Sequence, residues 1–248
     1  MALISELVGP YCGKPILVIC GGASVARTLD LIPQDYPACV ISANEHGFKQ
    51  DRFKVDFIVN VDLTFGQTRE KMQDRLRKYD TPIINRWSWA RYRIPEWNFN
   101  GDSGLTAVAV AVILGGHPVV VLGLDRSTGD RRYFWETTAE PGWTTRRRQP
   151  NIQQIRTDTQ RCVDFCRDSY IRVLEGPMLA YWPSFDATEK ISPWDQCAAP
   201  QVTLKGDWYA VERQPVFIHP SDQILTPKVF LTPNEAHPHL HMKKIRKL

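Results

Sequence analysis

Residues 100–125 read NGDSGLTAVAVAVILGGHPVVVLGLD, and this stretch decides the fold of the chain. Small and apolar residues fill positions 104–114, a composition typical of a helix buried on most of its faces, and we expect Ser103 in the preceding polar turn to cap it. A glycine pair ends the helix. The β-branched run at 119–122 then has the pattern of a central parallel strand covered on both faces. A buried helix that leads into such a strand predicts an α/β fold.

The composition limits the class of protein. A chain of 248 residues is long enough for one α/β domain with an extension, and a formal charge of +4 is too small to indicate a dedicated nucleic-acid-binding protein. The sequence shows neither a signal peptide nor an apolar run long enough to span a membrane. No cysteines form a CxxC pair, which favours reduced core thiols over disulfides or a zinc site. We therefore expect a cytoplasmic protein without a membrane span.

Short apolar runs alternate with helical patterns along most of the chain. The further strands are expected at residues 15–20, 38–43, 56–61, 82–85 and 171–174. The further helices are expected at residues 24–32, 68–79 and 152–168. This alternation predicts a Rossmann-like, mostly parallel sheet with helices on both faces over residues 1–183. The proline-rich residues 184–248 are expected to form an extended arm or a small β appendage, with strand-like pieces at 201–204, 215–218 and 228–231.

A glycine turn follows the first predicted strand. Gly21 and Gly22 let the backbone approach a ligand closely, and the hydroxyl of Ser24 with the N–H groups of the helix start suits a phosphate or a carboxylate. The turn does not fit the dinucleotide pattern GxGxxG, and many strand-to-helix turns need glycine for geometry alone. Both interpretations stay open.

Three asparagines lie at or near the ends of three successive predicted strands: Asn44, Asn60 and Asn85. An amide both donates and accepts, so it suits a base, a ribose or a phosphate, although asparagine also caps turns. The repetition at equivalent places favours one shared ligand. Asp102 and Asp125 lie in the same zone, at a helix start and at a strand end, where α/β sheets bind ligands or where residues only complete the core.

Residues 86–99 hold three tryptophans, one tyrosine and three arginines without a helical or strand period. They predict a long ordered loop. Such a loop beside the strand ends is either a lid over the ligand or an interface patch, since both uses enrich Trp, Tyr and Arg. The sequence leaves the two alternatives open.

Together these residues resemble the bacterial sialyltransferases that act on lipooligosaccharide and, more loosely, the group of the motility accessory factor and the archaeal hydroxymethylpterin pyrophosphokinases. The resemblance extends over about residues 15–177 and rests on the glycine–serine turn, the three asparagines, Ser103 with Gly104, and the GLD triplet at 123–125 followed by Tyr133. It implies that the positions of the three asparagines, Ser103 and Gly104 line a cytidine-nucleotide site. It also implies that Tyr133 contacts a donor phosphate, while the family's second phosphate-binding tyrosine aligns with Ser127.

The resemblance breaks at the general base. The sialyltransferases use a histidine shortly before their last helix, whereas this chain has no histidine between His117 and His219. A general base contributes about 10²–10⁴-fold to a rate, so Asp125, Glu136 or another carboxylate would have to replace it.

Three hypotheses follow for the function. The first is a nucleotide-dependent transferase, glycosyltransferase-like, with a nucleotide-sugar donor and with Asp125 and Tyr133 as catalytic residues. Its donor site comprises Gly21, Gly22, Ser24, Asn44, Asn60, Asn85, Asp102, Ser103 and Gly104. The second is a magnesium-dependent pyrophosphokinase acting on a pterin-like alcohol, with the metal on carboxylates such as Asp102 and Asp125. The third is a non-catalytic module whose aromatic loop and C-terminal arm dock a protein partner.

Overall fold

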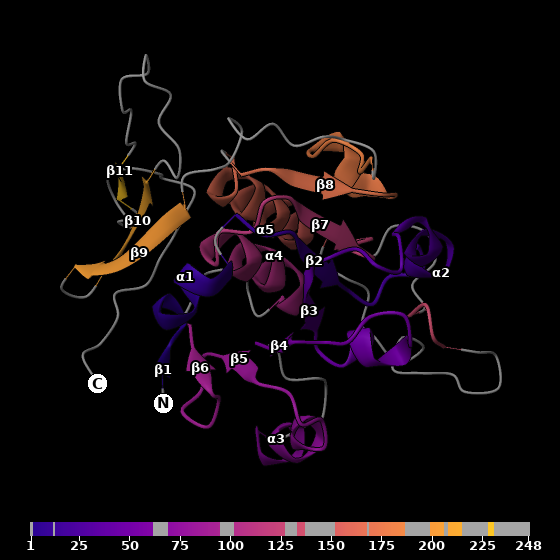
Figure 1. Cartoon of the computed structure of the whole chain (residues 1–248), viewed down its shortest axis with the longest axis horizontal. Helices are drawn as coiled ribbons and strands as arrows, with labels where there is room; N and C mark the ends of the chain where they lie inside the picture. Colours follow the sequence, from indigo (N-terminus) through magenta and orange to yellow (C-terminus); the bar gives the residue numbers. More distant parts are fainter. Residues whose placement is uncertain are drawn as a thin grey trace.

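Eight parallel strands form one sheet in the computed structural model (Figure 1). The structure describes residues 2–11, 13–61, 69–94, 102–126, 133–136, 152–167, 169–186, 199–205, 208–214 and 228–230. The strands of the sheet are β1 (Ala2–Leu3), β2 (Ile16–Ile19), β3 (Cys39–Ala43), β4 (Phe57–Val59), β5 (Ile83–Asn85), β6 (Tyr92–Arg93), β7 (Val119–Leu122) and β8 (Ile171–Val173). Their order is β1-β6-β5-β4-β3-β2-β7-β8, and every neighbouring pair is parallel. The predicted Rossmann-like α/β fold is confirmed.

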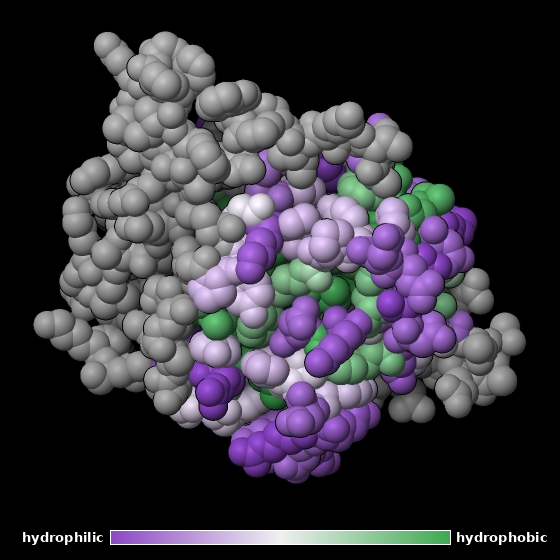
Figure 2. Space-filling model, viewed as in Figure 1, coloured by the Kyte–Doolittle hydropathy of each residue, from purple (hydrophilic) through white to green (hydrophobic). Residues whose placement is uncertain are grey.

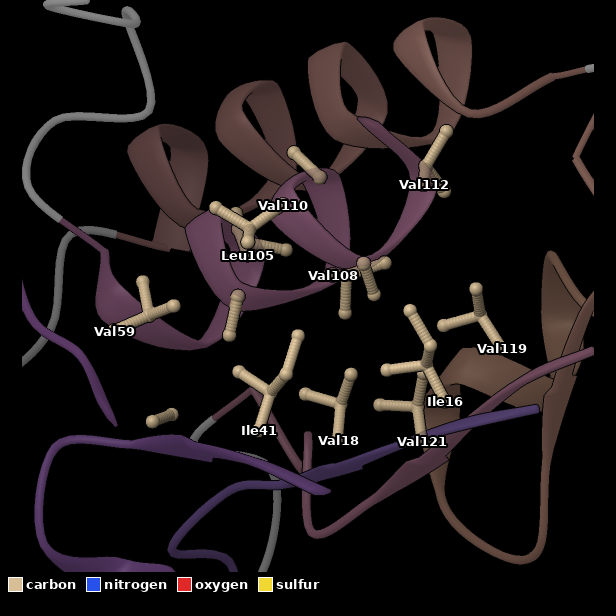
Figure 3. Packing of buried hydrophobic residues seen from close by; sticks show 14 of the residues in the cluster. Ile16, Val18, Ile41, Val59, Leu105, Val108, Val110, Val112, Val119 and Val121 are labelled. Atoms are coloured by element: carbon tan, nitrogen blue, oxygen red, sulfur yellow. The ribbon is translucent and has the colours of Figure 1, made fainter. Parts of the chain in front are cut away.

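Helices cover both faces of this sheet. They are α1 (Val8–Tyr11), α2 (Val25–Thr28), α3 (Arg69–Arg77), α4 (Ser103–Ile113) and α5 (Ile152–Phe165), with short 3₁₀ turns η1 (Ile4–Leu7), η2 (Leu29–Leu31), η3 (His46–Lys49) and η5 (Pro177–Ala180). On one face α4 packs against alternate strand residues that include Val18 and Val121, and α5 lies outside it (Figure 3). On the other face α2 and α3 cover the remaining strand residues, and α3 turns its charged side chains outward at the bottom of Figure 2.

The composition of α4 follows from its place between the sheet and α5. All of its residues except Gly104 are buried, so the helix has no solvent-facing side on which charged residues would occur. Val108 points onto the sheet, whereas Val110 and Val112 lie on the side of α5 (Figure 3). The predicted helix is confirmed, and so is the neighbouring strand β7, which pairs with β2 as expected.

The predicted cap of α4 is wrong by one residue. Asp102 is the N-cap, and its Oδ1 accepts a hydrogen bond of 2.9 Å from the backbone N–H of Leu105. Ser103 already belongs to the first turn, and its Oγ accepts a bond of 3.0 Å from the backbone N–H of Val61. The extended backbone of Asp102 (φ −75°, ψ 108°) lets its side chain fold back onto the helix, which a residue inside the first turn cannot do.

Two short strands were not expected from the sequence. β1 lies at the edge of the sheet, next to β6, and β6 falls within the segment predicted as a loop. Each has two residues, which is too few to show an alternating pattern. A separate antiparallel sheet contains β9 (Ala199–Lys205), β10 (Trp208–Gln214) and β11 (Lys228–Phe230), of which β10 was not expected. The strand-like piece at 215–218 lies outside the described residues, and the division of the chain at residue 183 stays a prediction.

The strand order reverses between β2 and β7. From β2 the chain moves outward through β3, β4, β5 and β6, and it then returns through α4 to the opposite side of β2. Open α/β sheets bind ligands outside the carboxyl ends of the strands at such a reversal. The turns after β2 and β7 therefore form the first place to look for a site.

Within the described residues, no helix has both the length and the apolar character needed to cross a membrane. The cysteines of this part of the chain are buried free thiols, as expected: Cys20, Cys39, Cys162 and Cys166. The other two, Cys12 and Cys197, lie outside it.

Candidate functional site

The carboxylate of Asp125 occupies the position between β2 and β7 where the sequence predicted a bound phosphate. Its Oδ2 accepts a hydrogen bond of 2.9 Å from the backbone N–H of Ser24, and its Oδ1 accepts one of 2.5 Å from the Ser24 hydroxyl. Both donors of Ser24 that suit an anion are thus used by a carboxylate of the chain itself. A phosphate at Ser24 would have to displace this carboxylate, and the role of Ser24 in phosphate binding stays a prediction.

The two glycines of the turn provide room for these contacts. A Cβ on Gly22 would lie 2.4 Å from Cγ of Asp125 and 2.6 Å from the carbonyl oxygen of Gly123. A Cβ on Gly21 would lie 2.6 Å from Nε2 of His46 and 2.7 Å from the ring of Tyr133. The turn therefore requires glycine at both positions because other side chains of the protein lie against the backbone, which is the geometric alternative left open by the sequence.

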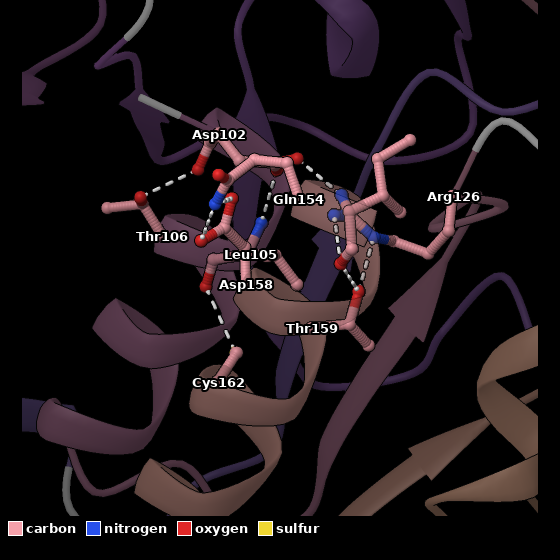
Figure 4. A network of polar contacts seen from close by, with 9 residues as sticks. Asp102, Leu105, Thr106, Arg126, Gln154, Asp158, Thr159 and Cys162 are labelled. Atoms are coloured by element: carbon pink, nitrogen blue, oxygen red, sulfur yellow. Dashed lines mark hydrogen bonds and ion pairs between the residues drawn. The ribbon is translucent and has the colours of Figure 1, made fainter. Parts of the chain in front are cut away.

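Arg126 makes the corresponding connection on the other face of the sheet. Its guanidinium donates from Nη1 to the Oδ2 of Asp102 at the start of α4, from Nε to Oγ1 of Thr159 (2.8 Å) and from Nη2 to the carbonyl oxygen of Ile155 (3.3 Å) (Figure 4). Arg126 has a positive φ of 54°, an uncommon conformation for a residue with a side chain. It thereby links the N-cap of α4 to α5.

The phosphate site expected to be shared by Ser24 and Ser103 stays a prediction. The two serines begin helices that cover opposite faces of the sheet, and each hydroxyl bonds to a group of the chain. Gly104 next to Ser103 allows close packing, because a Cβ there would lie 2.9 Å from the side chain of Leu124. Ser103 and Gly104 therefore seat α4 on the sheet.

The three predicted asparagines do meet. Asn44, Asn60 and Asn85 are the next residues in register after the last paired residues of β3, β4 and β5, so they lie side by side along the edge of the sheet. Asn85 donates from Nδ2 to Oδ1 of Asn60 (3.1 Å), and Asn60 donates from Nδ2 to Oδ1 of Asn44. We call these three residues the amide row. Asn60 and Asn85 are buried, and Asn44 is partly exposed.

A backbone group sets the direction of the amide row. The backbone N–H of Trp87 can only donate, and it donates to Oδ1 of Asn85 (3.0 Å). Each amide must then accept through its oxygen and donate through its nitrogen to the next. In the part of the chain that the structure describes, no acceptor is bound to Nδ2 of Asn44. The row thus ends in an N–H donor at the partly exposed Asn44, whose φ of 56° turns the chain sharply there.

The rings of His46 and Tyr133 lie against Gly21, which continues the register of the amide row on β2, and Trp135 packs against both rings. We call His46, Tyr133 and Trp135 the aromatic cluster. The His46 ring lies 4.4 Å from the Tyr133 ring, and Tyr133 stacks on Trp135 at 5.4 Å. The backbone N–H of Phe134 donates to the carbonyl oxygen of Gly21 (3.1 Å), which holds the cluster against the turn. Tyr133 therefore reaches the predicted site, although no nucleotide contact is visible in the protein alone.

The aromatic loop is only partly placed by the structure. Trp87 is buried against Met72 and Leu76 of α3, and Trp89 stacks on Trp87 at 5.9 Å. The lid interpretation is wrong for these two tryptophans, because they complete the core under α3. Residues 95–99 of the loop lie outside the described residues, as does Ser127.

The carboxylates of the site already bind other groups of the protein, and its thiol is buried. Asp102 bonds to Leu105 and Arg126, and Asp125 bonds to Ser24, so neither of them presents a free pair of oxygens to a magnesium ion. Among the described residues, no group of three or more His, Cys, Asp or Glu side chains forms a metal site. Burial raises the pKa of the Cys20 thiol far above its usual range, and the nearby carboxylates of Asp102 and Asp125 add to the effect, so this thiol is no nucleophile.

Two residues of this edge were missed from the sequence. His46 belongs to the polar stretch after the second strand, and Arg126 directly follows Asp125. The signal for both was their place after a strand end, but their roles depend on which face of the sheet each side chain reaches.

No protein-family model, curated protein or solved structure matches the chain.

Proposed function

We propose that the protein is a nucleotide-dependent transferase whose donor, a nucleotide-sugar, binds along the amide row. The observation that carries this proposal is the directed chain of amide hydrogen bonds that ends in an N–H donor at Asn44. Nucleobases, riboses and phosphates all carry acceptor oxygens or nitrogens that such a donor binds. The same asparagine positions match the residues that line the cytidine-nucleotide site of the sialyltransferases.

The aromatic cluster supplies the second part of the proposed site. Tyr133 lies over Gly21, beside the position of Asn44 in the register, and its ring is held between His46 and Trp135. In the proposal its hydroxyl donates to a phosphate of the donor. Asp125 positions the turn after β2 through Ser24 and does not react itself, which differs from the catalytic role expected from the sequence.

One observation favours a second function, binding without catalysis. The carboxylates named for chemistry, Asp102 and Asp125, are both used within the fold, and the family histidine has no counterpart between His117 and His219. A module that binds a nucleotide without transferring a group needs none of them. The magnesium-dependent pyrophosphokinase is the least supported of the three hypotheses, because the two carboxylates proposed as metal ligands already bind protein groups.

Calorimetric titration with cytidine nucleotides and with ATP, each with and without magnesium, tests the proposal. Asn44→Asp keeps the shape and the acceptor for Asn60 but replaces the final donor with a charged acceptor. We expect it to weaken nucleotide binding by about 10- to 100-fold, the loss of a hydrogen bond to a charged group. Tyr133→Phe removes one hydroxyl and should cost about 1.5–3 kcal/mol of binding free energy for the same reason.

Gln153→Glu is the matched control, since it makes the same amide-to-carboxylate change at an exposed position of α5 and should leave affinity unchanged. If the wild type binds no nucleotide, the transferase proposal fails. Binding that is equally tight in Asn44→Asp would place the nucleotide elsewhere. Incubation of a bound nucleotide-sugar then separates the two functions, because a transferase releases free nucleotide in the presence of an acceptor and a binding module does not.

A further inference from the structure

The hydrogen bond between Trp135 and His46 determines which nitrogen of His46 carries the proton. The indole Nε1–H of Trp135 lies 3.1 Å from Nδ1 of His46, and an indole N–H can only donate. Nδ1 must therefore be the acceptor, with its lone pair in use. In the neutral imidazole the single proton then lies on Nε2, the nitrogen that faces the backbone of Gly21.

The fold holds the His46 ring in this orientation from several sides. His46 is 6% exposed and contacts the backbone of Gly21 and the rings of Tyr133 and Trp135. The turn that carries it is fastened by Ser42, whose Oγ donates to the carbonyl oxygen of Asn44 (2.7 Å) and accepts from the backbone N–H of Gly47 (2.7 Å). A rotation of the ring that exchanged its nitrogens and carbons would place a C–H group against the indole N–H and lose the bond.

The charged groups around the aromatic cluster also affect whether His46 can take up a second proton. The ammonium of Lys49 lies over the Trp135 ring, 4.6 Å from its centre. On the other elements, the carboxylate of Glu136 accepts from the backbone N–H of Tyr133 (3.1 Å), Asp125 binds Ser24, and Glu45 pairs with Arg75. Protonation of Nδ1 would set its new N–H against the indole N–H, close to the cation of Lys49. The contact with Trp135 therefore opposes the imidazolium.

We infer that His46 is a positioning residue fixed as the Nε2–H tautomer, which holds Tyr133 against Gly21 and Trp135 beside it, and that it does not replace the missing general base. A general base needs a free lone pair, but Nδ1 uses its own on Trp135 and Nε2 already carries the proton. The inference rests on the proposed function in one respect only, the general-base role that it excludes for His46. The proton position itself is a property of the protein without any ligand.

The tautomer is measured directly in the full-length chain labelled with ¹⁵N, from the long-range ¹H–¹⁵N couplings of the imidazole. His46→Gln identifies the signals of His46 by their disappearance. We expect the Nε2–H pattern, unchanged between about pH 8 and pH 6, the interval in which an unrestrained histidine acquires its second proton. A proton on Nδ1, or an ordinary titration of His46 in this interval, would overturn the inference.

Trp135→Phe tests the cause, because it keeps an aromatic ring in the cluster and removes only the indole donor. We expect His46 of this variant to show both tautomers and to titrate. If Trp135→Phe does not fold, the wild-type spectrum alone decides. If the wild type binds a nucleotide-sugar, whose esterified phosphates do not titrate in this interval, its affinity should be the same at about pH 6 and pH 8, because His46 keeps its charge. If the wild type binds no nucleotide, the proposed function is wrong, but the tautomer of His46 can still be measured.

Discussion

At the scale of single residues, the turn after β2 has no room for a side chain. The expected effect of Gly22→Ala is a loss of about 1–3 kcal/mol in the free energy of unfolding, the usual cost of overpacking a closed site. A rotamer change cannot relieve the crowding, because one of the three atoms met by the new Cβ is the backbone oxygen of Gly123. Urea denaturation measures the loss.

Gly13→Ala is the comparison for this variant. Gly13 has a positive φ of 70° but no atom within 4 Å of an added Cβ, so its substitution reports backbone strain without crowding. A loss below about 0.5 kcal/mol at Gly22 would show that crowding by Asp125 and Gly123 is not what requires glycine after β2.

The asparagines show how far a single residue can be interpreted from the sequence. Their place after three apolar runs was sufficient to predict that Asn44, Asn60 and Asn85 meet, since parallel strands end at one edge. The direction of their hydrogen bonds was not predictable, because the backbone N–H of Trp87 sets it, and that contact depends on the path of the chain after β5. The bond between Ser24 and Asp125 was not predictable for a similar reason. A residue 101 positions away supplies the anion.

At the scale of elements, one arginine joins α4 to α5. Arg126→Lys keeps the charge, but an ammonium cannot bond at once to Asp102, Thr159 and the carbonyl oxygen of Ile155 as the guanidinium fork does. We expect the free energy of unfolding to fall by about 2 kcal/mol, since these bonds involve a charged donor in a largely buried place. Hydrogen exchange at the first turns of α5 should accelerate.

Arg167→Lys is the matched change on the surface. Its ion pair with Asp164 leaves 65% of the arginine side chain exposed, so the substitution should alter stability by less than about 0.5 kcal/mol. Similar losses for Arg126→Lys and Arg167→Lys would contradict the role of Arg126 as a link between helices.

Elements with a long and uniform pattern were predictable, and those defined by contacts were not. The small apolar residues of α4 and the β-branched residues of β7 indicate by themselves that both elements are buried. The N-cap is Asp102, whereas Ser103 was predicted. Both residue types are good caps, and the backbone angles that decide between them are not specified by the sequence. Trp87 and Trp89, interpreted as a loop over the ligand, instead fill the space under α3, whose position the sequence does not specify.

At the scale of the whole molecule, buried thiols make the free energy of unfolding fall at alkaline pH. Burial raises the pKa of Cys39 to about 12 and raises that of Cys20 as well, and a hydrogen bond with Cys166 together with burial raises the pKa of Cys162 well above its usual value. In the unfolded chain these thiols ionise near pH 8.5, so above this pH the unfolded state binds fewer protons than the folded state. The free energy of unfolding should therefore be intact below about pH 8 and fall above it, by about 1 kcal/mol per pH unit for each thiol.

Chemical denaturation between about pH 7 and pH 10.5 measures this dependence. Cys39→Ala removes one of the contributing groups, so its stability should fall less steeply with pH than that of the wild type, whatever its stability at neutral pH. A stability that is constant up to about pH 10 would contradict the burial of these thiols.

Asp125 and Arg126 are joined by a single peptide bond, yet they are fastened to layers on opposite faces of the sheet. Asp125 holds the start of α2, and Arg126 holds α4 and α5. The end of β7 thus acts as a mechanical linkage between the two layers. Because close-packed interiors transmit strain, a displacement of Asp125 from Ser24 would also strain the contacts of Arg126 with α4 and α5.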